Sequence, residues 1–328
     1  MKNNWKQPPK KKASSAKKPA PNAKPKKKPE PWTPPFPPQG KPAPTSAGKH
    51  QIPEVMPSSN QSVIDVPFKE VPAEEPRKAP GTAKRDFIRA FEKLAGYGKH
   101  APWEVWADFI VMTACSISNI VDPMHYEERE KRYTAIVKKY TGQEYEHFTE
   151  MLANTILALE DDPEQDFLGQ IYMEFGLNNK NLGQEPIPYD VSAMIARISM
   201  SDLPARMEHC DVIRLDNSRG GDGGELIASI NEARKQLAKI NRNFQNHLLV
   251  SGQDTDEIVA LMSYIQVSLL GVAGFFKVGD SSTDPMASGD SKENYWYTPM
   301  YCIGATWQMR RAIYQANRLL RGLMDELE

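Results

Sequence analysis

Apolar residues recur at helical spacing in the stretch that begins at Asp86. Side chains three or four positions apart share one face of a helix, so this spacing predicts a series of amphipathic helices over residues 86–204. We expect the indole rings of Trp103 and Trp106 to lie in the core of this helical subdomain. The predicted helices and apolar stripes are Phe87 to Leu94, Trp103 to Ile110, Glu127 to Tyr140, Phe148 to Leu159 and Asp166 to Phe175.

After residue 205, short apolar runs alternate with helical stretches. The runs predict strands at 211–216, 247–251 and 274–278, with helices at about 225–240 and 258–270. Strands separated by helices of this length predict parallel crossovers and a three-layer α/β sheet over residues 205–328. A last helix is expected from Trp307 to Leu327, and its arginines fit a solvated face better than a phosphate contact; they are Arg310, Arg311, Arg318 and Arg321.

The composition changes after residue 85. Residues 1–85 hold 18 Lys and Arg against 6 Asp and Glu, and the remainder holds 23 against 36, so charges of +12 and −13 combine to a net charge of −1. The same stretch contains 19 of the 27 prolines. A stretch with this much proline and charge has too little apolar surface to form a core of its own. We therefore predict a disordered, basic tail over residues 1–85. Its lysine clusters are spaced by Trp5, Trp32 and Phe36, which suits salt-sensitive binding to DNA; a solubilising linker is the alternative.

The three cysteines, Cys115, Cys210 and Cys302, are odd in number and far apart in sequence, which fits a reducing, cytoplasmic setting. The basic N-terminus lacks the apolar stretch of a secretory signal. The apolar run Tyr264 to Phe276 is shorter than the ~20 residues that span a bilayer. No membrane segment is therefore expected.

Glycines form a turn between the first predicted strand and its helix, in Leu215 to Ile227. Such a turn lets a ligand approach the N-terminus of the helix. A P-loop is excluded because Gly-Lys-Ser/Thr is missing, a calcium loop because Ile227 is not acidic, and a dinucleotide fingerprint because Leu226 is not glycine. An ordinary strand-to-helix loop remains the alternative, and no metal site is predicted.

Acidic residues follow three successive strands: Asp216, Asp254 and Asp280. Ligands of open α/β sheets bind at the carboxyl edge of the strands. There an acid after the second strand can accept hydrogen bonds from ribose hydroxyls, and an acid after the third can lie near an adenine amino group. Helix capping is the alternative role for each of them. Together with the glycine turn, the three acids predict a half-site for an adenosine cofactor.

Five stretches occur in a recognisable order: Asp166-Phe-Leu-Gly-Gln-Ile-Tyr172, Gly183-Gln-Glu-Pro-Ile-Pro-Tyr-Asp-Val191, Asp216 to Ile227, Gln253-Asp254 and Gly279-Asp280. They resemble the N-6 adenine DNA methylases related to modification subunits of type I restriction systems, in the group found on prophages and conjugative elements. The resemblance spans about residues 100–301 and implies a Rossmann-like methyltransferase sheet that binds S-adenosylmethionine. The cofactor-binding residues that it implies are Pro188, Asp216, Gly221, Gly223, Gly224, Asp254 and Asp280.

The sequence departs from this family at two places. Glu185, Pro186 and Ile187 replace two aromatics and a threonine, which removes a hydroxyl and adds a negative charge beside the cofactor's carboxylate. The tetrapeptide Asn/Asp-Pro-Pro-Phe/Tyr, which holds a flipped adenine during methyl transfer, is missing. The nearest candidates for catalysis are Asp284 and Pro285, with the segment 297–301 as a second possibility; ordinary turn chemistry accounts for both segments without catalysis.

The resemblance implies an adenine-N6 DNA methyltransferase of a phage or mobile element, with DNA as its substrate. Two alternatives stay open. One is a catalytically inactive module with a methylase fold that binds DNA or protein. The other is one subunit of a split methyltransferase, because a full methyltransferase sheet needs strands that the sequence after Tyr301 does not predict.

Overall fold

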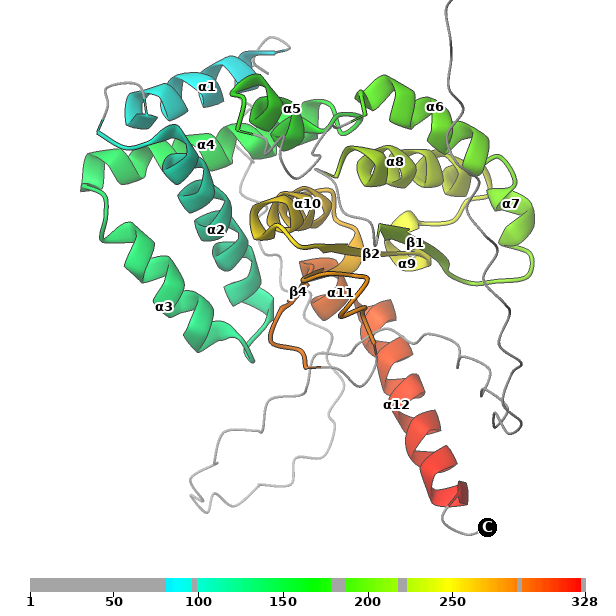
Figure 1. Ribbon diagram of the computed structural model, residues 1–328. Helices are drawn as coiled ribbons and strands as arrows, with labels where there is room; N and C mark the ends of the chain where they lie inside the picture. Colours follow the sequence, from blue (N-terminus) through cyan, green and yellow to red (C-terminus); the bar gives the residue numbers. More distant parts are fainter. Residues whose placement is uncertain (1–80, 96–98, 178–186, 218–222, 288–290, 326–328) are drawn as a thin grey trace, which may run out of the picture. The chain divides into compact units, whose positions relative to one another are not determined.

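The computed structural model describes residues 81–95, 99–177, 187–217, 223–287 and 291–325, and for 318–325 the backbone alone. The predicted tail therefore lies outside the described residues up to residue 80. Helix α1 begins at Thr82, and seven helices precede the first strand in the described part of the chain (Figure 1). They are α1 (Thr82–Ala95), α2 (Pro102–Val121), α3 (Tyr126–Val137), α4 (Gly142–Asp161), α5 (Phe167–Glu174), α6 (Tyr189–Ser199) and α7 (Leu203–Arg206).

The sheet has four strands in the described residues, in the order β1-β2-β3-β4. The first three are parallel, as predicted, and helices join them. In chain order the elements are β1 (Ile213–Asn217), α8 (Gly224–Lys239), α9 (Phe244–His247), β2 (Leu248–Asp254), α10 (Glu257–Leu269), β3 (Ala273–Val278), β4 (Tyr295–Tyr297), α11 (Pro299–Ile303) and α12 (Ala305–Asp325). The protein is thus α/β with a small mixed sheet and a large share of helix.

A fourth strand, which the sequence does not predict, lies at one edge of the sheet. Tyr295–Tyr297 form a strand that runs antiparallel to β3, with Phe275 opposite Tyr297 and Lys277 opposite Tyr295. Three consecutive aromatic residues suit a pleated, buried strand, since each side chain packs on one face or the other. All three are buried.

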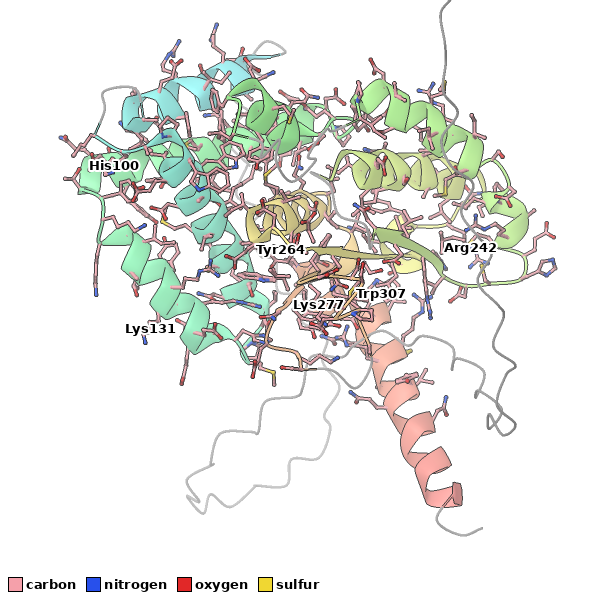
Figure 2. All side chains as sticks on the ribbon, viewed as in Figure 1. His100, Lys131, Arg242, Tyr264, Lys277 and Trp307 are labelled. Atoms are coloured by element: carbon pink, nitrogen blue, oxygen red, sulfur yellow. The ribbon has the colours of Figure 1, made fainter. Side chains whose placement is uncertain are left out.

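The two faces of the sheet differ. Figure 1 shows α8 and α10 on one side of the strands and α11 and α12 on the other. The α10 side holds one continuous apolar cluster that extends from Ala83 to Trp296, so helices before and after residue 205 share a core. The opposite side is filled by aromatic rings 5.7 to 6.4 Å apart, namely Phe275, Tyr295, Tyr297, Tyr301 and Trp307. Tyr264 and Lys277 mark these two sides in Figure 2.

The tryptophan prediction is confirmed for one ring. Trp106 is fully buried and packs on Phe87 with a centroid distance of 6.1 Å, whereas Trp103 is 44% exposed. Both lie on α2, one turn apart, so the helix presents Trp106 to the core and Trp103 partly to solvent.

Among the described residues, α2 is the one helix that is long and apolar enough to cross a membrane by length and composition alone. Most of it is buried inside the protein, where it packs against α3 and α10. It also carries Asp108, whose carboxylate accepts hydrogen bonds from Lys139 and Tyr140. These contacts are those of a core helix.

A buried polar cluster fastens β4 to the helices. Arg129 donates to Asp122 at 2.8 Å and to the backbone carbonyl of Tyr295, and its guanidinium lies 3.8 Å from the ring centroid of Trp296. Burial would raise the pKa of Asp122, but the hydrogen bonds and charges of His125 and Arg129 outweigh it and lower that pKa. Removing one partner of such a buried pair costs about 3–5 kcal/mol.

Candidate functional site

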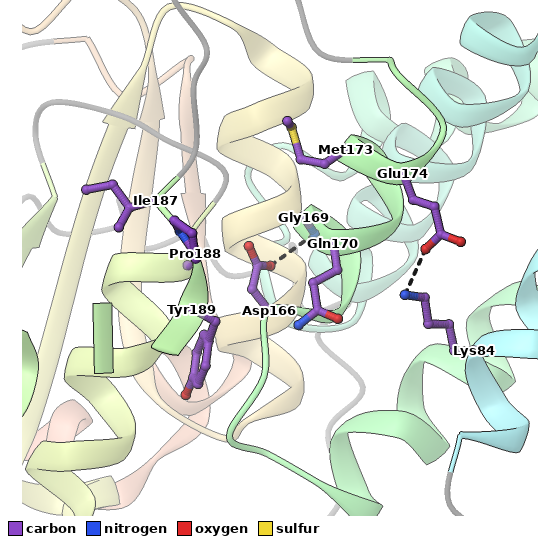
Figure 3. A pocket seen from close by; sticks show the side chains of 10 residues that line it. Lys84, Asp166, Gly169, Gln170, Met173, Glu174, Ile187, Pro188 and Tyr189 are labelled. Atoms are coloured by element: carbon purple, nitrogen blue, oxygen red, sulfur yellow. Dashed lines mark hydrogen bonds and ion pairs between the residues drawn. The ribbon is translucent and has the colours of Figure 1, made fainter. Parts of the chain in front are cut away.

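A cavity of about 520 Å³ lies where four segments of the chain meet. They are Lys84 of α1, residues 166–174 in and before α5, residues 187–189 at the start of α6, and Gly224, the first residue of α8. Cavities of this size are typical of small-molecule sites. Figure 3 shows its lining, which consists, in the described residues, of Lys84, Asp166, Gly169, Gln170, Met173, Glu174, Ile187, Pro188, Tyr189 and Gly224.

Asp166 is the buried charge of this cavity, with 4% of its surface exposed. It is the N-cap of α5, and its Oδ1 accepts a hydrogen bond from the backbone N–H of Gly169 at 3.0 Å. The amide of Gln266 on α10 donates to the same oxygen at 2.8 Å, and the carbonyl oxygen of that amide accepts from the N–H of Leu168. Since Gln266 is fully buried, α10 fixes both the carboxylate and the first turn of α5.

Gly169 has no room for a side chain. A Cβ at this position would lie 2.0 Å from Oδ2 of Asp166 and 2.6 Å from its Cγ. The spacing Asp-x-x-Gly therefore has a physical reason: the glycine leaves space for the carboxylate that caps the helix.

Pro188 and Tyr189 form the opposite wall. Pro188 is the N-cap of α6, and the hydroxyl of Tyr189 accepts a hydrogen bond from Asn231 on α8 at 3.2 Å. Burial raises the pKa of Tyr189, which keeps this hydroxyl protonated. Ile187 adds an apolar side chain that is 42% exposed. Glu185 and Pro186 lie outside the described residues.

The glycine turn ends at the cavity. Gly223 is the N-cap of α8 and has a φ of +99°, a conformation that favours glycine. A Cβ on Gly223 would lie 2.8 Å from the hydroxyl of Ser263 on α10, so close packing also requires glycine here. Gly223 has no side chain to cap α8, and the first residue of the helix, Gly224, lines the cavity. Gly221 lies outside the described residues.

The three predicted acids lie at the carboxyl ends of adjacent strands, but in different surroundings. Asp216 accepts a hydrogen bond from Ser251 at 2.9 Å. It follows the core residue Leu215 on β1, and neighbouring side chains of a strand point to opposite faces of the sheet. It therefore points to the side of the sheet opposite α8. Asp254 ends β2 and accepts from the N–H of Asp256 at 2.8 Å.

Asp280 belongs to an exposed turn after β3. Its carboxylate accepts hydrogen bonds from the N–H of Ser282 at 2.8 Å and from the hydroxyl of Thr283 at 3.1 Å. These donors lower the pKa of Asp280. Neither Asp254 nor Asp280 is among the described residues that line the cavity.

The first candidate for catalysis, Asp284, is tied to a lysine that the sequence did not single out. Nζ of Lys277 lies 2.8 Å from Oδ1 of Asp284 and 3.1 Å from its backbone oxygen. The amide of Gln253 donates to the same backbone oxygen at 2.8 Å. Lys277 is buried, with 2% of its side chain exposed, whereas the Asp284 side chain is 58% exposed.

The second candidate segment is part of the core. Thr298 is buried and caps α11, its hydroxyl donating to the carbonyl of Val272 and accepting from the N–H of Gly274, both at 2.8 Å. Tyr297 and Tyr301 stack on each other with ring centroids 5.8 Å apart. These groups hold β4 and α11 on β3.

Three charged side chains line the cavity among the described residues: Lys84, Asp166 and Glu174. Lys84 is the one cation among its described lining residues and forms an ion pair with Glu174 at 2.8 Å. No cluster of three or more His, Cys, Asp or Glu side chains placed to hold a metal ion occurs in the described part of the chain.

No family model, no curated protein and no solved structure matches this chain.

Proposed function

We propose that this protein binds S-adenosylmethionine in the cavity between α5, α6 and α8, as a protein of the Rossmann-like methyltransferase type. One observation carries the proposal: three sequence stretches that resemble methylase motifs, separated by up to 58 residues from Asp166 to Gly224, line a single cavity of about 520 Å³. The cavity opens at the N-terminus of a helix that follows the first strand of a parallel set, which is where α/β folds bind ligands.

The residues that line the cavity fit the cofactor. Pro188, Tyr189 and Ile187 supply apolar and aromatic surface, and Gly224 allows close approach to the backbone of α8. In this proposal the adenosine extends toward the ends of β2 and β3, where Asp254 accepts hydrogen bonds from the ribose and Asp280 lies near the adenine. When bound, S-adenosylmethionine supplies a methyl group activated by its sulfonium.

The finer proposal is adenine-N6 methylation of DNA by a protein of a phage or mobile element. It rests on the order of the five stretches in the sequence. The basic residues 1–85 would contribute sequence-independent binding to DNA. Deleting residues 1–80 should then lower both the affinity for DNA and its dependence on salt; an unchanged salt slope would refute this role.

A second candidate function, binding without methyl transfer, is favoured by the contacts of Asp284. In the resembled family an Asn or Asp side chain accepts a hydrogen bond from the adenine amino group, and here Oδ1 of Asp284 already accepts from Lys277. The position of β1 at the edge of the described sheet also suits a protein that is completed by a partner subunit.

Calorimetric titration with S-adenosylmethionine tests the proposed binding. We expect saturable binding to the full chain, and loss of it in Asp254→Ala. Asp202→Ala is the control, because this residue precedes α7, its side chain is 64% exposed, and it is not among the described residues that line the cavity. Absence of binding at millimolar cofactor would overturn the proposal.

Expression in a methylation-deficient host separates the two functions. Sequencing of the host DNA should detect N6-methyladenine if the protein is a working methyltransferase, and Asp254→Ala should abolish it. Unmodified DNA from cells that contain the folded, cofactor-binding protein would establish the second function instead.

A further inference from the structure

Helix α12 leaves one apolar face uncovered by the described residues. Met309 is 66% exposed and Ile313 is 55% exposed, although both side chains are large and apolar. Ala312 and Ala316, which lie on the same side of the helix, are exposed as well. An amphipathic helix of a globular protein usually turns such a face toward the core. The exposed face of α12 therefore marks an interaction surface.

The opposite side of α12 holds the helix on the protein. Trp307 is buried at its start. Arg310 forms an ion pair with Asp211, and Arg311 donates a hydrogen bond to the backbone oxygen of Cys302 at 2.9 Å. These contacts fix the first turns of α12. A partner therefore meets a helix that is already formed, and the entropy of ordering it does not oppose binding.

The apolar residues of this face have the spacing of helices that pair with other helices. They follow one another at intervals of four, three, four and three residues, and we call them the α12 seam: Met309, Ile313, Ala316, Leu320 and Leu323. Alternating intervals of three and four are the pattern of a coiled coil, in which apolar side chains of one helix insert between those of the other. Helix α12 has 21 residues and contains the whole seam, so it extends over about 30 Å.

The charges of α12 favour a neutral partner for this seam. No charged residue belongs to it. The two arginines of α12 whose side chains are described, Arg310 and Arg311, are engaged by Asp211 and by carbonyl groups of α11. A phosphate of DNA or of a lipid headgroup would instead need cations on the face that it contacts. A twofold contact brings a face onto itself, so two copies of the uncharged seam meet without repulsion between like charges.

We infer that α12 is a dimerisation helix, whose seam packs against the seam of a second copy of this chain. This inference goes beyond the proposed function and does not depend on ligand binding. The seam covers two heptads, fewer than the three or four that long coiled coils have. The dimer is therefore weak, and it should dissociate on dilution through the micromolar range.

Analytical ultracentrifugation of the full chain tests the inference. The wild type should shift from monomer to dimer as its concentration rises through the micromolar range. Ile313→Glu should weaken the dimer at least about 30-fold, because it buries an unpaired carboxylate in each copy. Since Ile313 is 55% exposed in the single chain, the melting temperature of the monomer should not change.

Ile198→Glu is the matched control, because Ile198 is 69% exposed on α6 and lies outside the seam. It should leave the dissociation constant of the dimer within about twofold. If Ile313→Glu does not fold, Met309→Glu is measured in its place.

Three results would overturn the inference. The first is a wild type that stays monomeric throughout the concentration range. The second is a dimer that Ile313→Glu leaves intact or that Ile198→Glu weakens equally. The third is a monomeric wild type that sediments with vesicles containing phosphatidylserine, which would assign the exposed face of α12 to a lipid surface instead.

Discussion

The cavity at α5 and the loop after β3 both place an aspartate near the carboxyl edge of the sheet, yet the two aspartates are held in opposite ways. Asp166 is 4% exposed and its described donors are neutral, whereas the Asp284 side chain is 58% exposed and is paired with a buried lysine. The first carboxylate caps α5 at the wall of a cavity. The second uses the charge to anchor a loop. Ligand binding and methyl transfer therefore have different support in this protein.

The largest effect is expected from Gly169→Ala. The new Cβ would lie 2.0 Å from the Asp166 carboxylate, so the cap of α5 must move. Overpacking costs about 1–3 kcal/mol and a lost N-cap about 1 kcal/mol, and the affinity for S-adenosylmethionine should fall with the free energy of unfolding. Thermal melting and calorimetry measure the two quantities.

Gly142→Ala is the matched control, because Gly142 starts α4 and a Cβ there would have no atom within 4 Å. We expect no loss of stability or of binding. Similar losses of stability and binding in both glycine variants would contradict this account. They would show that glycine is not required at position 169 to make room for the Asp166 carboxylate.

Lys277→Met should have an intermediate effect on stability, and this effect should be confined to the loop after β3. We expect a loss of about 1.5–3 kcal/mol, the contribution of one hydrogen bond to a charged group, because the Asp284 side chain is 58% exposed and can be hydrated by water once Lys277 is removed. Binding of S-adenosylmethionine at the cavity should remain. Urea denaturation with calorimetry checks both expectations.

The control for this change is Lys235→Met, which breaks an exposed ion pair with Glu164 whose side chains are 42% and 46% exposed. Pairs of this kind contribute about 0–1 kcal/mol. If Lys277→Met costs no more than Lys235→Met, the loop is not anchored by its buried lysine. If it abolishes binding, the two regions are not independent.

Asp280→Asn should have the smallest effect on stability, and it should depend on pH. The donors at Ser282 and Thr283 lower the pKa of Asp280 in the folded protein. The resulting stabilisation is present above the unfolded pKa of about 3.9 and is lost as the pH falls through the lower folded pKa. Melting temperatures of wild type and variant should differ near neutral pH and converge under strong acid; a constant difference would contradict this role.

The sequence predicts the parallel part of the sheet well for a physical reason. The strands around Leu215, Val250 and Phe276 are short apolar runs. The helical stretches between them are long enough to cross from the end of one parallel strand to the start of the next. β4 could not be predicted, because three residues are too few to show an alternation of apolar and polar positions. Thr298-Pro299, which is typical of a turn, follows it directly. Trp103 and Trp106 share one predicted apolar stripe, but the burial of each ring depends on how α5 packs on α2. The ring centroids of Trp106 and of Tyr172 on α5 are 5.9 Å apart.

The cofactor role of the predicted site residues stays a prediction, but the cavity brings two of them together. Pro188 and Gly224 were expected at a cofactor site, and both line the cavity. The anchoring of Asp166 by Gln266 and of Asp284 by Lys277 was not foreseen. Gln266 lies 100 residues from Asp166, and no local pattern encodes such a contact. The pairing of Lys277 requires a turn that brings Asp284 back over β3.

The most direct test of the account is the structure of the protein with S-adenosylmethionine. We predict that the cofactor occupies the cavity between α5, α6 and α8. A cofactor bound elsewhere, or an empty cavity at saturating cofactor, would contradict the account.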